Sequence, residues 1–152
     1  GSEMCIRDRN MDNTLALIIV PMLEQLKATK HGTPWTKDED VPEHLRSTAA
    51  PPLTQEQIDT GTCDDNHDAR WEWILDEMIW AFKTHIDDEW DDQFYSGKHD
   101  IRWEKDPETG YSKMVTGPND TWKVDSKGLK ADQERRANGF RLFGVYYQAL
   151  WD

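Results

Sequence analysis

The sequence predicts a mainly α-helical fold: a three-helix, bundle-like domain with a β-hairpin inserted between the second and third main helices. Apolar residues recur at spacings of three and four in three stretches, which is the period of an amphipathic helix. Between the second and third stretches the period changes to two, which is typical of a strand. We expect one domain over residues 10–152, with helices over about 14–30, 66–95 and 129–150 and a hairpin over about 100–116.

The central helix is the element against which the rest of the chain is expected to pack. The stretch Arg70–Tyr95 is the longest unbroken helical pattern, and a turn of 100° per residue gathers its aliphatic residues and Trp71 on one side. Trp73 and Trp80 fall on the opposite side. A helix with two apolar faces is expected to be covered on two sides. The alternative is that Trp73 and Trp80 form an exposed patch for a protein partner.

The flanking segments follow from similar local signals. Pro21 lies inside the first helix and is expected to kink or restart it. The connector 33–61 is rich in proline, and Thr54 with Gln57 forms a capping-box pattern that predicts a short helix over Gln55–Thr60. We expect the connector to wrap over the bundle, held by Trp35 and Leu45.

A second short helix is expected in the connector over Pro42–Arg46, because proline is favoured at a first helical position. The last helix contains two glycines, and Gly144 shares its apolar stripe with Phe140. A glycine on such a stripe indicates close approach to another helix, since its presence in a helix interior otherwise costs about 1 kcal/mol.

The hairpin is predicted from alternation around a strong turn. Ile101, Trp103 and Lys105 alternate with charged residues, and the turn Asp106–Gly110 precedes a second extended run. A short third strand is expected at 122–124. Because an isolated two-stranded ribbon is marginally stable in water, we expect Trp103 or Trp122 to dock on the bundle or on a neighbouring subunit.

Composition restricts the classes of function. The 152 residues include 30 acidic and 18 basic ones, a net charge of -12, which argues against nonspecific binding to nucleic acid or anionic membranes. The same charge on helices is compatible with a mimic of DNA. No apolar run approaches the ~20 residues of a membrane span. Cys5 and Cys63 are expected to be free thiols.

The first nine residues, Gly1–Arg9, do not read as part of the fold. Gly1 is compatible with a cloning scar, and Ser2–Arg9 resembles the translated adapter-type sequence found at the ends of metagenomic shotgun reads. The segment also lacks the apolar region of a signal peptide. We therefore expect it to be disordered and the protein to be soluble and intracellular.

One candidate cation site lies at the end of the central helix. His85, Asp88 and Asp92 fall on one side of a continuous helix, with Glu89 beside them. Carboxylates and an imidazole at this spacing could share a divalent cation, which would support a metal-dependent hydrolase. The alternative is a solvated acidic helix end.

Three more specific metal patterns fail. No Glu-x-x-His motif is present, so a di-metal carboxylate bundle is excluded. The calcium-loop pattern beginning at Asp64 fails at Ala69, where glycine is required. The acidic clusters 64–68 and 89–92 loosely resemble those of all-α nucleotide pyrophosphohydrolases, but on one continuous helix they would lie about 30 Å apart.

Three stretches carry a resemblance to known proteins: Leu15–Leu26, Trp73–Phe82 and Gly139–Asp152, of which Leu75–Phe82 is the most specific part. They resemble a group of small uncharacterised proteins encoded by tailed bacteriophages. The group has no established activity, so no functional residue is carried over. The resemblance implies a phage or prophage origin and action in the cytoplasm of an infected bacterium.

These observations lead to one preferred function and two alternatives. Catalytic motifs are absent and aromatic residues are abundant, so we expect a non-enzymatic accessory protein that binds a protein partner or forms a homo-oligomer. Its candidate interaction residues are Trp73, Trp80, Trp103 and Trp122. The alternatives are a metal-dependent hydrolase using His85, Asp88, Glu89 and Asp92, and an acidic DNA mimic.

Overall fold

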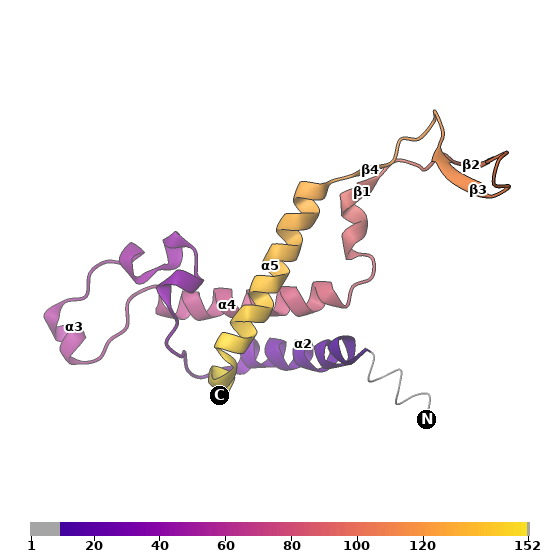
Figure 1. The fold of residues 1–152 in the computed structure, drawn as a ribbon. Helices are drawn as coiled ribbons and strands as arrows, with labels where there is room; N and C mark the ends of the chain where they lie inside the picture. Colours follow the sequence, from indigo (N-terminus) through magenta and orange to yellow (C-terminus); the bar gives the residue numbers. More distant parts are fainter. Residues whose placement is uncertain (1–9, 152) are drawn as a thin grey trace, which may run out of the picture. The chain divides into compact units, whose positions relative to one another are not determined.

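A computed structural model describes residues 10–151 of the chain. The fold is mainly helical with a hairpin inserted between the last two helices, as predicted (Figure 1). The α-helices are α2 (Met11–Thr29), α3 (Gln55–Asp59), α4 (His67–His85) and α5 (Ser126–Val145). The strands are β1 (Tyr95–Ser96), β2 (Ile101–Lys105), β3 (Ser112–Thr116) and β4 (Lys123–Val124). The segment Gly1–Arg9, which the sequence sets apart, lies outside the described residues.

The chain forms two compact units. The helical unit is made of the chain up to Asp87 together with the chain from Glu134 onward, and the hairpin unit is Asp88–Gln133. Within residues 10–151, none of the helices combines the length and the apolar character that a membrane span needs.

In the helical unit, α2 and α4 lie side by side and antiparallel (Figure 1). Their ion pairs run in opposite sequence order: Glu24 with Lys83 at 2.8 Å, Lys27 with Asp76, and Lys30 with Glu72. Pro21 lies within α2 and does not end it. The side chain of Pro21 is exposed.

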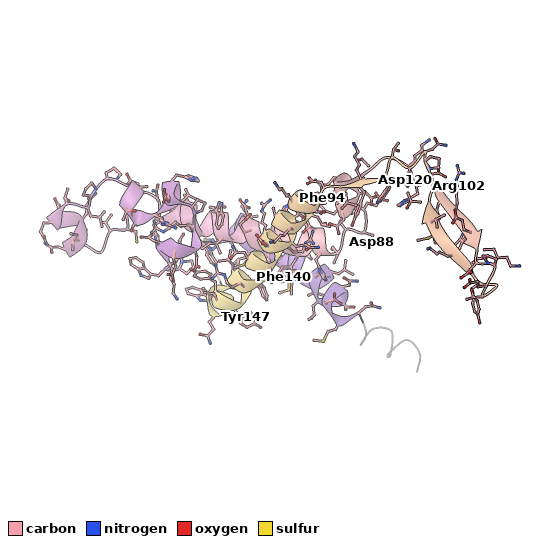
Figure 2. All side chains as sticks on the ribbon, turned by 45° about the horizontal axis from the view of Figure 1, so that its top comes forward. Asp88, Phe94, Arg102, Asp120, Phe140 and Tyr147 are labelled. Carbon is pink, nitrogen blue, oxygen red and sulfur yellow. The ribbon has the colours of Figure 1, made fainter. Side chains whose placement is uncertain are left out.

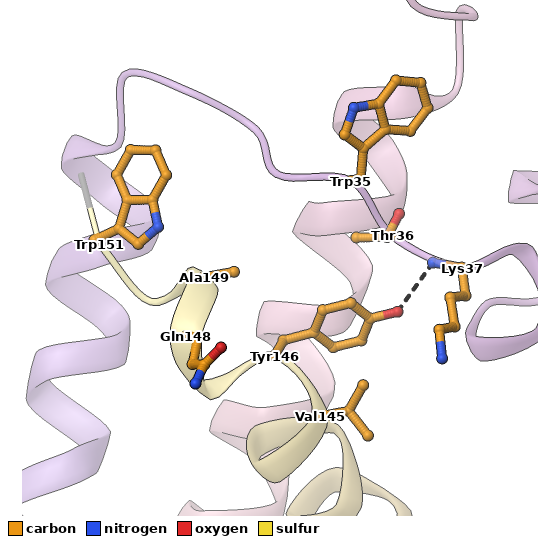
Figure 3. A pocket seen from close by; sticks show the side chains of 8 residues that line it. All are labelled: Trp35, Thr36, Lys37, Val145, Tyr146, Gln148, Ala149 and Trp151. Carbon is orange, nitrogen blue, oxygen red and sulfur yellow. Dashed lines mark hydrogen bonds between the residues drawn. The ribbon is translucent and has the colours of Figure 1, made fainter.

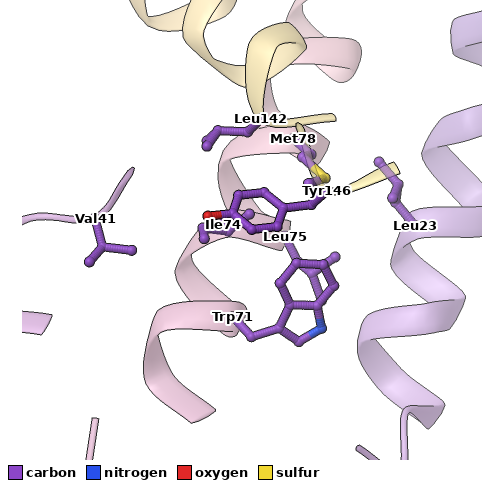
Figure 4. Close-up of a cluster of buried hydrophobic side chains, with 8 residues drawn as sticks. All are labelled: Leu23, Val41, Trp71, Ile74, Leu75, Met78, Leu142 and Tyr146. Atoms are coloured by element: carbon purple, nitrogen blue, oxygen red, sulfur yellow. The ribbon is translucent and has the colours of Figure 1, made fainter. Parts of the chain in front are cut away.

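The core of the helical unit follows the stripe that the sequence predicts on the central helix. Trp71 is 1% exposed, and Ile74, Leu75 and Met78 are completely buried. Around them lie one residue from α2, one from the connector and two from the C-terminal segment (Figure 4): Leu23, Val41, Leu142 and Tyr146. Segments from both before and after α4 therefore contribute to one core.

Helix α5 comes into close contact with α4 at Gly139. A Cβ atom at this position would lie 2.4 Å from the Cβ of Ala81 and 2.7 Å from the carbonyl oxygen of Glu77. The prediction that Gly144 makes the close approach is wrong, because a Cβ atom there meets nothing within 4 Å. The predicted stripe on the last helix is also displaced by one residue: Gly139, Leu142 and Tyr146 are buried, whereas Tyr147 is 63% exposed.

The central helix ends at His85, ten residues before the predicted end at 95. Lys83 and His85 occupy the last turn, where positive charge favours the helix dipole, and the acidic run that begins at Asp87 would oppose it. Thr84 also donates its hydroxyl to the carbonyl of Trp80 at 2.8 Å, a bond typical of helix ends and bends. The chain continues through a turn into the 3-10 helix Trp90–Phe94.

The connector contains three 3-10 helices, Asp38–Asp40, Glu43–Leu45 and Ser47–Ala49, followed by α3. The capping box of Thr54 and Gln57 is present as predicted. Leu45 packs against the core as predicted, whereas Trp35 is 77% exposed and makes only a T-shaped contact with the ring of His67 on α4, with centroids 5.3 Å apart. Polar contacts also hold the connector, since buried Arg70 donates hydrogen bonds to the hydroxyl of Thr36 at 3.3 Å and to the carbonyl of Leu45 at 3.2 Å. The carboxylate of Asp64, just after the connector, accepts two further hydrogen bonds from Arg70 at 2.8 Å.

The hairpin unit contains two separate antiparallel pairs of strands. In the hairpin, Ile101 is opposite Thr116 and Trp103 is opposite Met114. The predicted third strand exists as β4, but it pairs with β1, with Val124 opposite Tyr95. No local sequence signal indicated this pairing, because the partners are separated by the whole hairpin.

Candidate functional site

The four tryptophans predicted to mediate interactions fall into two groups. Trp73 and Trp80, on α4, are half-buried, and Trp73 packs against the hydrophobic core. The guanidinium carbon of Arg135 lies 3.9 Å from the centre of a Trp80 ring. Both side chains therefore contribute to contacts within the helical unit.

The cover over Trp80 is itself held in place by an ion pair. Arg135 donates two hydrogen bonds to Glu77, at 3.0 and 2.7 Å, and Glu77 is 8% exposed. Paired, nearly parallel donation fixes the plane of a guanidinium and so favours stacking on an indole. Sequence periodicity placed Trp80 on a second face, and an arginine rather than an apolar side chain covers it.

Trp122 and Trp103 lie in the hairpin unit and have different surroundings. Trp122 is 36% exposed, and its rings stack on His99 with centroids 4.1 Å apart and on Tyr95 at 5.5 Å. Trp103 is 68% exposed. Within the hairpin unit, Trp122 is therefore partly covered by aromatic neighbours, whereas Trp103 is largely exposed.

The two faces of the hairpin differ: one carries its large apolar residues together with Lys105, Ser112 and Thr116, and the other is mostly charged. Because side chains alternate along a strand, Ile101 and Trp103 share a face with Met114, which is directly opposite Trp103. Their exposed fractions are 46%, 68% and 59%. The other face carries Val115 and three charged residues, Arg102, Glu104 and Lys113. We call Ile101, Trp103 and Met114 the hairpin face.

Turn residues and backbone hydrogen bonds order this exposed hairpin at both ends. At the tip, Gly110 has a φ of +75° and its N–H donates to the carbonyl of Asp106 at 2.8 Å. At the base, the carboxylate of Asp100 accepts the N–H of Asn119 at 2.9 Å, which lowers the pKa of Asp100. Figure 2 marks Arg102 on β2 and Asp120 in the segment that follows β3. The Asp120 carboxylate accepts the N–H of Asp100 at 2.9 Å.

The geometric premise of the predicted cation site is wrong. His85 is the last residue of α4, so Asp88, Glu89 and Asp92 do not continue its helix face. The imidazole of His85 lies 2.7 Å from the carboxylate of Asp12, and this hydrogen bond lowers the pKa of Asp12. Among residues 10–151, no three aspartate, glutamate, histidine or cysteine side chains converge as ligands for a metal ion.

A shallow pocket of about 500 Å³ lies at the C-terminal end of the helical unit (Figure 3). Trp35 and Trp151 stand on opposite sides, 77% and 70% exposed, and Tyr146 lies between them. Sequence reasoning missed this pocket because it placed Trp35 on the core and Trp151 on a helical stripe. An extended segment and a chain end carry no periodicity that could have brought the two indoles together.

The hydroxyl of Tyr146 in this pocket makes hydrogen bonds that stabilise the fold. The Tyr146 hydroxyl donates to Asp40 at 2.6 Å and accepts the N–H of Lys37 at 3.0 Å. The second oxygen of Asp40 lies 2.9 Å from Arg141. Burial, and then the hydrogen bond to Asp40, raises the pKa of Tyr146 to about 12. The phenol is therefore neutral at physiological pH and suited to holding the connector rather than to proton transfer.

Comparison with known proteins adds no family to this description. No protein-family model, curated protein or solved structure matches the chain. The functional argument therefore depends on the surfaces themselves, and the hairpin face is the one that contains a predicted interaction residue in an open position.

Proposed function

We propose that this protein is a non-enzymatic accessory protein that binds another protein through the hairpin face. In line with the resemblance to tailed-phage proteins, we place its action in the cytoplasm of an infected bacterium. The observation that carries the proposal is the 68% exposure of Trp103 on an ordered hairpin. Tryptophan is among the residues that most often dominate the free energy of protein association.

The partner that fits this surface is a protein with an apolar pocket for an indole. Trp103, Met114 and Ile101 form a continuous apolar strip, and Tyr111 at the tip is 78% exposed. A rigid aromatic side chain loses little conformational entropy on binding. The charges on the opposite face are of both signs, so they keep the hairpin hydrated without selecting an oppositely charged partner.

The backbone of the hairpin offers a second mode of contact to the same partner. The sheet of β2 and β3 has two strands, so each strand keeps one edge with no neighbouring strand among the described residues. A partner segment can add a strand at such an edge, and every second side chain of that segment then lies on the same side as the hairpin face. We expect the indole of Trp103 to supply most of the binding free energy in either arrangement.

The test compares two substitutions that change charge equally on opposite faces. Immobilised wild-type protein, Trp103→Lys and Val115→Lys are exposed to bacterial lysate, and captured proteins are quantified by mass spectrometry. We expect one protein to be captured by the wild type and by Val115→Lys but to decrease at least tenfold with Trp103→Lys. Identical captured sets from all three proteins would contradict the proposal.

The same experiment separates the DNA-mimic alternative. A captured protein that is retained by both variants and is displaced by added duplex DNA would indicate that the acidic surface, with a net charge of -12 for the chain, is recognised instead. A purified captured protein then allows its affinity for the three forms to be measured directly.

A further inference from the structure

Helix α2 has two apolar faces, of which one has no neighbour among the described residues. Ala16, Val20 and Leu23 are buried. On the other side, the long side chains are between 41% and 65% exposed, and they recur at spacings of four, three and four: Met11, Leu15, Ile18 and Met22. A turn of 100° per residue places these four within about 60° of one another. We call them the α2 stripe.

The spacing of the α2 stripe is that of a helix–helix seam. Alternating steps of three and four are the a and d positions of a coiled coil, where each side chain fits between residues of a facing helix. A second helix with the same repeat is therefore the geometric complement of this surface. A second copy of the chain supplies that helix with the matching spacing, and a two-fold axis brings equivalent residues together.

Charge on α2 is directed away from the stripe. The helix contains three charged residues, and each contacts a residue of α4: Glu24 and Lys27 form ion pairs with Lys83 and Asp76, and Asp12 is hydrogen-bonded to His85 at 2.7 Å. The exposed stripe is consequently neutral, although the chain carries a net charge of -12. Two copies can therefore meet along α2 without placing like charges against each other.

The same distribution of charge argues against other occupants. A helix that lies on an anionic membrane carries lysine or arginine beside its apolar face. Here Lys27 is the one basic residue of α2, and it is paired with Asp76. A basic protein partner would require an acidic margin, which the neutral stripe does not provide.

We propose that two copies of the protein associate through the α2 stripe to form a homodimer. This inference does not rest on the hairpin face or its function. Four partly exposed side chains bury on the order of 300–400 Å² per copy, which is below the roughly 800 Å² of a standard interface. An interface of this size is typical of weak association, so we expect the dimer to be reversible.

Sedimentation velocity of the full chain over a concentration series tests the proposal. We expect the wild type to shift from monomer to dimer at tens of micromolar, and Ile18→Glu to weaken association at least tenfold. The matched control is Leu17→Glu on the same helix, because Leu17 is 63% exposed but lies about 100° away from Ile18. We expect this control to associate like the wild type.

Met22→Lys provides a second stripe variant if Ile18→Glu does not fold, since Met22 is 65% exposed. A wild type that remains monomeric at several hundred micromolar would overturn the proposal, and so would equal weakening by Leu17→Glu. A monomer that binds phosphatidylcholine–phosphatidylglycerol vesicles through Ile18 would overturn it in favour of a lipid surface. Trp103→Lys should leave the dimer intact, so the two proposals can fail separately.

Discussion

The helical unit and the hairpin unit use tryptophan in opposite ways. Trp71 is 1% exposed and meets the edge of Tyr146, with ring centroids 5.9 Å apart. Trp103 is 68% exposed on a two-stranded hairpin. The helices pack on several neighbours, whereas a two-stranded sheet by itself offers no second layer. Apolar area therefore stabilises the first unit and remains exposed to solvent in the second.

The polar side chains also differ in burial between the two units. The helical unit contains buried charges, such as Arg70 and Glu77, that depend on a specific partner. In the hairpin unit, Asp100 and Thr121 bind backbone groups in turns. Removing one partner of a buried charge leaves an unsatisfied group in a low-dielectric environment, whereas an exposed group is hydrated again. Substitutions should therefore have large effects in one unit and small effects in the other.

The largest effect is expected from truncating the buried tryptophan. Trp71→Ala should lower the free energy of unfolding by about 3–5 kcal/mol, because it removes apolar contacts and leaves a cavity. The same truncation in the hairpin, Trp103→Ala, should change it by less than about 0.5 kcal/mol. Urea unfolding followed by far-ultraviolet circular dichroism measures both values. Equal losses would mean that the hairpin face contributes to folding.

A smaller but still substantial effect is expected at the buried ion pair between Arg70 and Asp64, near the start of α4. Arg70→Met should cost about 3 kcal/mol at pH 7, because it leaves the carboxylate of Asp64 without its bidentate partner. Addition of Asp64→Asn should recover part of this loss. Chemical denaturation of the two single variants and the double variant measures the coupling. Strictly additive losses would show that the pair makes no net contribution.

The same pair gives a pH dependence with a definite sign. The hydrogen bonds from Arg70 lower the pKa of Asp64 below its ordinary value. A carboxyl whose pKa is lower in the folded state contributes stability above its unfolded pKa, about 3.9, and this contribution is lost as the pH falls through the folded pKa. The stability of Arg70→Met should therefore fall less steeply than that of the wild type between pH 5 and the acid limit of folding.

The smallest of the three effects is expected where α5 crosses α4. Gly139→Ala should destabilise the protein by about 1–3 kcal/mol, although alanine favours a helix by about 1 kcal/mol, because its Cβ meets Ala81 and Glu77. Gly144→Ala is the matched control, since a Cβ there meets nothing within 4 Å, and should stabilise by about 0.5–1 kcal/mol. Thermal unfolding measures the change in stability of both variants. If both substitutions changed stability in the same direction, the close contact between α5 and α4 would not lie at Gly139.

The candidate site could be predicted only in part. Alternation around Asp106–Gly110 located the hairpin and put Trp103 among the interaction residues. The exposure of Trp103 depends on what lies over it, and strand periodicity does not carry that information. The pocket between Trp35 and Trp151 joins residues more than a hundred positions apart, so no local pattern indicated it.

What the sequence determined by itself is the local structure: three main helices, the short helix capped by Thr54, and the hairpin turn. Helical spacing, capping and turn chemistry act over a few residues, so they can be read directly from neighbours in the chain. Only the tertiary structure decided the end of α4 at His85, the crossing at Gly139 and the pairing of β1 with β4. These features depend on contacts between distant segments, where packing and electrostatics outweigh local preference.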